Sequence, residues 1–96
     1  MRADYDSQAD ALSIDLIQFD LFEYQESVHD TYCQVAFGKG VPANVELLNP
    51  AEHLDLLDVV AGRYELDGAA LLAAAQAALA APDRIVDLEV GARVAA

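Results

Sequence analysis

Residues 43–62 read ANVELLNPAEHLDLLDVVAG, and within this stretch the hydrophobic pattern changes from that of a strand to that of a helix. Before Asn49, apolar and polar residues alternate, as they do in a strand with one buried face. Asn49 can cap a helix, Pro50 suits the first helical turn, and Glu52 stands three residues after the cap. The sequence therefore predicts a helix that begins at Asn49 and ends near Gly62.

The residues before this boundary show strand patterns that are separated by turns. The expected strands cover residues 2–5, 11–16, 22–28, 32–37 and 43–48. The first two would form a hairpin across the polar turn at residues 6–10. The last two would form a second hairpin across the glycine-containing turn at residues 38–40, with Pro42 at a strand edge. Residues 17–21 fit neither a strand nor a helix clearly.

The rest of the chain predicts a second helix and a last strand. Asp67 can cap a helix over residues 68–80, which must end before Pro82. Alternation over residues 84–90 predicts the strand. The expected fold is a single α+β domain over residues 1–96, with a small antiparallel sheet of about five or six strands packed with two helices.

The charge of the chain limits its partners. Seventeen acidic and five basic side chains give the 96 residues a formal net charge of −12. Nucleic acids and anionic membranes require clustered Lys and Arg, so we expect neither as a partner. The one Cys cannot form an internal disulfide, and no basic segment followed by an apolar run opens the sequence. We therefore expect a cytoplasmic protein.

The sequence contains no clear catalytic or metal-binding motif. His29 and His53 are the two imidazoles, and nothing in their spacing places them in one site. Cys33 alternates with apolar residues, which indicates a buried and unreactive thiol. Acidic residues within 4–15 partly follow the spacing of a calcium-binding loop, but Ala9 stands where that loop needs glycine. We therefore expect no catalytic residue, no bound metal and no cofactor.

The second predicted helix is unusually apolar. Gln76 is the one polar side chain from residue 69 to residue 81. A helix that is apolar all round is normally buried, and a chain of this length can cover only one side of it. We therefore expect a homodimer. The interface candidates are Leu71, Leu72, Ala75, Ala78 and Leu79. The alternative is a surface helix that is rich in Ala because Ala favours helices.

Residues 5–14 read YDSQADALSI, which resembles the pattern Tyr-Asp-x-x-Ala-Asp-Ala-Leu-x-Ile of the prokaryotic family catalogued as domain of unknown function 2283. Residues 45–51 are similar to its Ile-Glu-Ile-Leu-Asp-Ala-Ser segment, and residues 28–30 stand where it has Val-Asp-Asp. The resemblance covers about residues 1–57, and residues 58–96 extend beyond it. It implies a bacterial source and a small antiparallel sheet followed by a helix. The family is uncharacterised, so the resemblance implies no activity, ligand or catalytic residue.

These observations favour a non-catalytic interaction module that attracts a basic partner protein, such as the neutralising half of a toxin and antitoxin pair. Two alternatives remain open. One is a small enzyme or metal-dependent hydrolase that uses His29 or His53 with Asp carboxylates. The other is a carrier of a small ligand in a crevice between two subunits. The acidic surface could also serve solubility alone.

Overall fold

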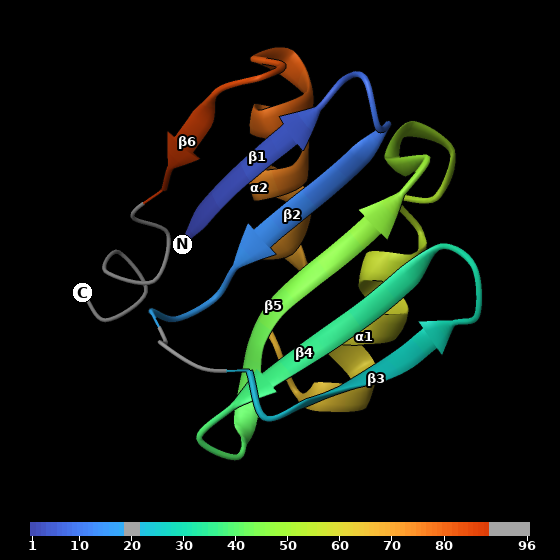
Figure 1. Cartoon of the computed structure of the whole chain (residues 1–96), viewed down its shortest axis with the longest axis vertical. Helices are drawn as coiled ribbons and strands as arrows, with labels where there is room; N and C mark the ends of the chain where they lie inside the picture. Colours follow the sequence, from blue (N-terminus) through green and yellow to red (C-terminus); the bar gives the residue numbers. More distant parts are fainter. Residues whose placement is uncertain (19–21, 89–96) are drawn as a thin grey trace.

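The computed structural model describes residues 1–18 and 22–88, which form an α+β fold (Figure 1). A six-stranded antiparallel sheet packs with two helices, as the sequence predicts. The elements are β1 (Arg2–Asp6), β2 (Ala11–Asp15), β3 (Tyr24–His29), β4 (Cys33–Gly38), β5 (Val41–Leu48), α1 (Leu56–Tyr64), α2 (Gly68–Ala80) and β6 (Ile85–Asp87). No helix in these two described ranges has the length and hydrophobicity of a membrane-spanning segment.

The strand order in the sheet is β3-β4-β5-β2-β1-β6. Both predicted hairpins are confirmed, because β1 pairs with β2 and β4 pairs with β5. Pairing of β5 with β2 joins the two hairpins. The late strand β6 pairs with β1, where Val86 lies opposite Ala3. The sheet therefore brings together strands from both ends of the described chain.

The two hairpin turns follow from local chemistry. In the first turn, the Asp6 carboxylate accepts hydrogen bonds from the backbone N–H groups of Gln8 and Ala9, at 3.0 and 3.2 Å. In the second turn, Lys39 and Gly40 have φ values of 56° and 76°. Glycine adopts a positive φ without steric penalty, so the glycine-containing turn ends β4 as expected.

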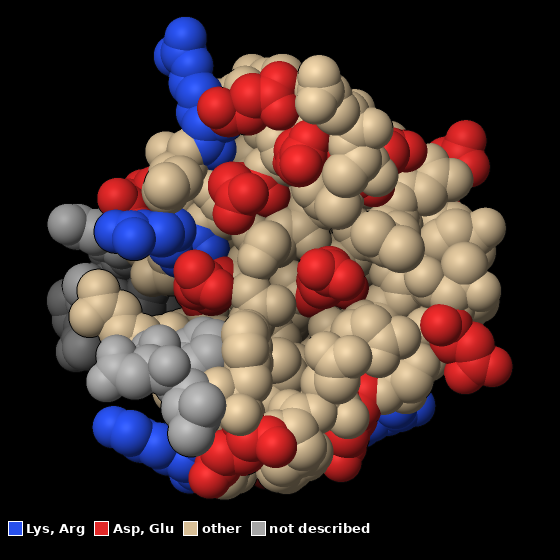
Figure 2. All heavy atoms as spheres, viewed as in Figure 1, with Lys and Arg blue, Asp and Glu red and all other residues tan. Residues whose placement is uncertain are grey.

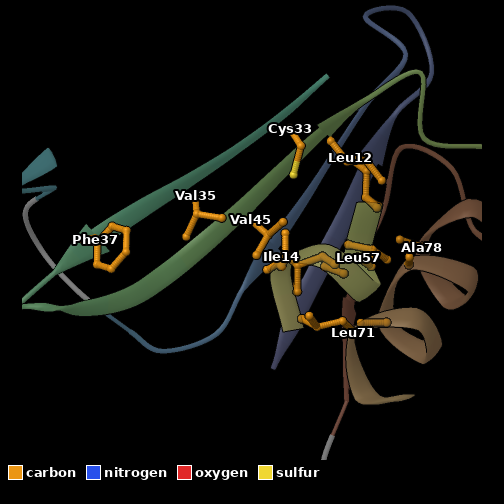
Figure 3. Packing of buried hydrophobic residues seen from close by; sticks show 14 residues of the cluster. Leu12, Ile14, Cys33, Val35, Phe37, Val45, Leu57, Leu71 and Ala78 are labelled. Atoms are coloured by element: carbon orange, nitrogen blue, oxygen red, sulfur yellow. The ribbon is translucent and has the colours of Figure 1, made fainter. Parts of the chain in front are cut away.

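The hydrophobic core lies between the sheet and the helices (Figure 3). Alternate residues of each strand point to the same face of a sheet, so one set of strand positions supplies the apolar side chains. α2 packs against β1 and β2, while α1 contacts β3 and α2. The larger fully buried side chains include Leu12, Ile14, Val35, Val45, Leu47, Leu57, Val60 and Leu71.

The first helix begins later than predicted. Residues 50–52 form only a 3-10 turn, and the α-helix begins at Leu56. Asn49 has a left-handed backbone with φ 49° and makes no side-chain cap, while its backbone N–H donates to the Asp10 carbonyl at 2.9 Å. A 3-10 turn does begin directly after Asn49, but the prediction of one continuous helix from there to Gly62 was wrong, because the left-handed backbone of Asn49 differs from the extended conformation in which a side chain caps a helix.

The second helix agrees with its prediction. α2 covers residues 68–80, and the Asp67 carboxylate accepts a hydrogen bond from the Ala70 backbone N–H at 3.1 Å. β6 covers only residues 85–87 of the strand expected over 84–90, and residues 89 and 90 lie outside the described residues.

Candidate functional site

The sheet has one face that no helix covers. Both helices lie behind the sheet in Figure 1. Figure 2 has the same viewpoint, so it shows the face of the sheet that the helices leave uncovered. Because Leu12 and Ile14 point into the core, Ser13 and the residues paired with it point to the open side. Acidic side chains are spread over this open face, whereas the visible Lys and Arg side chains lie mainly at its margins (Figure 2).

Cross-strand pairing arranges the side chains of the open face in two rows that run across all six strands. The Arg2 row, from β6 to β3, consists of Asp87, Arg2, Asp15, Asn44, Ala36 and Gln25. The Asp4 row consists of Ile85, Asp4, Ser13, Glu46, Gln34 and Ser27. We call these two rows the acidic face. It carries four carboxylates and one cation, which is Arg2.

The carboxylates of the acidic face are only partly neutralised. Arg2 Nε lies 3.0 Å from the Asp87 carboxylate, and both side chains are exposed, so this ion pair adds little stability. Asn44 Nδ2 donates to the Asp15 carboxylate at 2.8 Å. The pKa of Asp4 is raised, first by burial and then by the charges of Asp15 and Asp6. A cation brought to this face would relieve that repulsion.

His29 and His53, which the sequence does not place in one site, lie near each other. Their ring centroids are 6.4 Å apart, and the Tyr32 ring stacks on His53 at 3.9 Å. His29 Nδ1 accepts hydrogen bonds from the backbone N–H groups of Thr31 and Tyr32, both at 3.2 Å. A neutral imidazole that accepts at Nδ1 carries its proton on Nε2. In this arrangement His29 has no free lone pair for a metal ion or a substrate proton.

Cys33 lies in the core with no exposed surface, so the predicted inward orientation is confirmed. Desolvation by burial raises the pKa of its thiol to about 11. The thiolate is the nucleophilic form of cysteine, so Cys33 is not an accessible nucleophile. Within residues 1–18 and 22–88, no group of three or more His, Cys, Asp and Glu side chains is arranged to hold a metal ion.

The structure divides the five interface candidates of α2 into two groups. Leu71, Ala75 and Ala78 are buried in the core of the protomer, so they are not available to a second copy. Leu72 is exposed and Leu79 is partly buried. The outer side of α2 is uncharged, and its exposed residues are Ala69, Leu72, Ala73, Gln76 and Ala80.

Two hollows adjoin the acidic face. The larger, of about 540 Å³, is lined by Met1, Arg2, Asp15, Leu16, Ile17, Gln18, Phe22 and Asp87. The smaller, of about 200 Å³, is lined by Phe22, Glu23, Tyr24, Gln25 and Ala36. Charged side chains line both hollows, and neither His29 nor His53 is among the lining residues. The smaller hollow is mainly apolar, but its volume is below the roughly 300–1,000 Å³ of typical ligand pockets.

Comparison with known proteins finds no matching family model, no matching curated protein and no matching solved structure. The resemblance of residues 1–57 to the domain of unknown function 2283 family is therefore neither supported nor contradicted and stays a hypothesis. Function has to be inferred from the acidic face itself.

The sequence predicts an acidic surface but does not show which carboxylates share one face of the sheet. Asp4, Asp15 and Glu46 each occupy a strand position that alternates with buried residues, which is a signal that they point to the open side. Their assembly depends on the pairing of β2 with β5. Alternation within a strand gives no information about that pairing. The sequence therefore indicates that these three side chains point away from the core, but not that they lie on one surface.

Proposed function

We propose that this protein is a non-catalytic interaction module that binds a basic partner protein through its acidic face and assembles with a second copy of itself. The observation that carries the first part is the uncovered sheet face with four carboxylates and one cation. A surface of one sign attracts a partner of the opposite sign and raises the rate of association.

The spacing of the carboxylates favours a macromolecule over a small cation. Asp4 and Glu46 stand in the same row two strands apart, with Ser13 between them. Neighbouring strands are about 4.8 Å apart, so the backbones at these two carboxylates are separated by about 10 Å. One small ion bridges these positions poorly, whereas several Lys or Arg side chains of one protein can meet them separately. A toxin with a basic surface is one such partner.

The other proposals have less support. The hydrogen bonds to His29 Nδ1 leave it poorly suited to act as a general base or a metal ligand. The carrier proposal places its ligand in a crevice between two subunits, and the larger hollow of the single chain is lined by Asp15 and Asp87 as well as by apolar side chains. A binding module needs neither a reactive imidazole nor an apolar cavity. It needs only an accessible surface that is complementary to its partner.

The uncharged outer side of α2 supports the proposed contact between two copies. Each chain carries a formal charge of −12, so two copies repel each other least where they bring uncharged surfaces together. A helix of 13 residues is about 20 Å long, and a stable interface covers about 800 Å² on each partner. The contact must therefore extend beyond Leu72 and its neighbours.

Charge variants of two surfaces test the acidic face. The first variant combines Asp4→Asn, Asp15→Asn and Glu46→Gln. The control combines Asp55→Asn, Asp58→Asn and Glu65→Gln, which removes the same charge from exposed residues of the α1 region. Binding of an oligolysine peptide is measured by calorimetry.

We expect the acidic-face variant to bind the oligolysine about tenfold more weakly than the wild type, and the control to bind within about twofold of it. Backbone NMR shifts of the wild type should then change on β1, β2 and β5 as peptide is added. Equal weakening by the two variants would contradict the proposal, because net charge alone would explain it.

A further inference from the structure

Exposed apolar side chains gather at one end of the sheet. Seven large apolar side chains are exposed in the described part of the chain, and four of them lie at this end. We call these four the end patch: Ile17, Phe22, Tyr24 and Val41. In Figure 1, β2 ends on the left at about mid-height, and β3 and β5 begin below it. Monomeric proteins rarely leave large apolar side chains clustered in water, so such a patch marks an interaction surface.

Backbone contacts bring the end patch together from separate segments. The Leu16 N–H donates to the Ala43 carbonyl at 2.8 Å, which holds the residues after β2 beside the start of β5. Tyr24 lies opposite Phe37 on β4, and the two rings stack with centroids 4.6 Å apart. Val41 lies opposite Gly38 in the same hairpin. Tyr24 and Val41 therefore belong to strands of the sheet, and Ile17 and Phe22 lie in the segments that flank β2 and β3.

The end patch borders the acidic face along the Arg2 row. Phe22 lines the larger hollow together with Arg2 and Asp15, which belong to that row. It also lines the smaller hollow together with Gln25 and Ala36, which are at the other end of the same row. A partner that lies over the carboxylates therefore meets Phe22 at one side of its footprint, whereas Tyr24 stacks on buried Phe37 and lies toward the helix side of the sheet.

We infer that the partner binds through an amphipathic segment, in which Lys or Arg side chains cover the acidic face and a large aliphatic or aromatic side chain contacts the end patch. This inference rests on the proposed function and specifies the partner further. Exposed ion pairs contribute little each and are screened by salt, whereas a few buried apolar or aromatic side chains supply most of the affinity in many interfaces. The charges set the rate of association and the apolar anchor sets the lifetime of the complex.

Two peptides test this inference on the wild-type protein. One alternates lysine and serine, and the other has the same sequence with a leucine and a tryptophan added at one end. We expect the second peptide to bind about fivefold more tightly. The dependence of log Kd on log salt concentration should be the same for both peptides, because they carry the same charge.

A matched pair of variants locates the anchor. Val41 and Val59 are both 45% exposed, but Val41 lies in the end patch and Val59 lies on α1. In Val41→Ser, the leucine and tryptophan should no longer tighten peptide binding by the full fivefold factor. In Val59→Ser, they should tighten it as much as in the wild type. Phe22→Ala is a second variant of the end patch and should lose the gain as well.

The outcomes separate this inference from the proposed function. If both peptides bind the wild type equally, or if Val41→Ser, Phe22→Ala and Val59→Ser all keep the full gain, the apolar anchor is overturned. The acidic face would then still account for binding through its salt dependence. If neither peptide binds at all, the proposed function fails and the anchor fails with it.

Discussion

On β2, Leu12 and Ile14 are buried beneath the helices, while Ser13 between them faces solvent in the row of Asp4 and Glu46. The two faces of the sheet thus come from alternate residues of the same strands. Apolar contacts on the covered face hold the fold together. Side chains on the open face contribute little to the core, so they can be acidic without unfolding the protein.

The largest difference between the faces should appear in stability. Leu12→Ala should lower the free energy of unfolding by about 2–5 kcal/mol, because Leu12 has no exposed surface and its truncation leaves a cavity. Ser13→Ala, one residue along the strand, should lower it by about 1 kcal/mol or less through loss of the hydrogen bond from Asn44 Nδ2. Urea denaturation measures both values. Equal losses would contradict the separation of roles between the faces.

Substitutions on the exposed and buried sides of α2 should differ in whether they affect dimer formation or folding. Leu72→Glu should weaken the proposed dimer at least about tenfold and leave the helical circular dichroism unchanged, because Leu72 is exposed in the protomer. Leu71→Glu should unfold the chain, since Leu71 is buried. Light scattering at micromolar concentration measures the association. A wild-type mass of 10.3 kDa would contradict the proposed dimer.

The covered face also depends on α2 remaining helical. Asp67→Ala should lower the free energy of unfolding by about 1 kcal/mol, because it removes the side-chain cap on the Ala70 N–H. Asp55→Ala is the control, since Asp55 precedes α1 but makes no side-chain cap hydrogen bond. Asp55→Ala should lower the free energy of unfolding by only a few tenths of a kcal/mol, which is about the effect of an ordinary surface substitution. Thermal and urea denaturation measure the difference.

The smallest expected effect concerns charge on the open face. The pKa of Asp4 is raised in the fold by burial and by Asp15 and Asp6, so its ionised form destabilises the folded state. That penalty is present above the folded pKa and fades as the pH falls toward the unfolded value of 3.8. Asp4→Asn should therefore stabilise the protein by about 0.5 kcal/mol or less near neutral pH, and the gain should shrink near pH 4.

Asp83 should show the opposite sign. Hydrogen bonds from the Ser7 backbone N–H and hydroxyl lower the pKa of Asp83, so its ionised form stabilises the fold above the unfolded pKa. That stabilisation is lost as the pH falls through the folded pKa. Asp83→Asn should thus destabilise the protein near neutral pH, where Asp4→Asn stabilises it. Urea denaturation measures the free energy of unfolding of both variants near neutral pH and near pH 4. If both substitutions changed it in the same direction near neutral pH, this interpretation would be contradicted.

Much of the fold could be predicted because its signals are local. The alternation at Leu12 and Ile14, the glycines of the second hairpin turn and the cap at Asp67 each act within a few residues. The capping signal at Asn49 is equally local, but a left-handed backbone at Asn49, whose N–H bonds to the distant Asp10 carbonyl, leaves only a 3-10 turn there, and α1 begins later, at Leu56.

The candidate site could not be predicted for the same reason. Asp4, Asp15 and Glu46 form one surface only because β5 pairs with β2. His29 and His53 approach each other only because the turn after β3 lies beside the chain that leaves β5. Such contacts depend on the whole chain, and alternation within one strand does not determine them.

The pairing of β6 with β1 has a consequence for synthesis of the chain. The ribosome releases the first five strands well before α2, which covers Leu12 and Ala3, and before β6, which flanks β1. About forty residues separate Leu48 from Asp87, and translation at about 5–20 residues per second needs about 2–8 seconds for them. During that interval the first hairpin presents a bare apolar side to the crowded cell, where a chaperone can hold it until the last strand arrives.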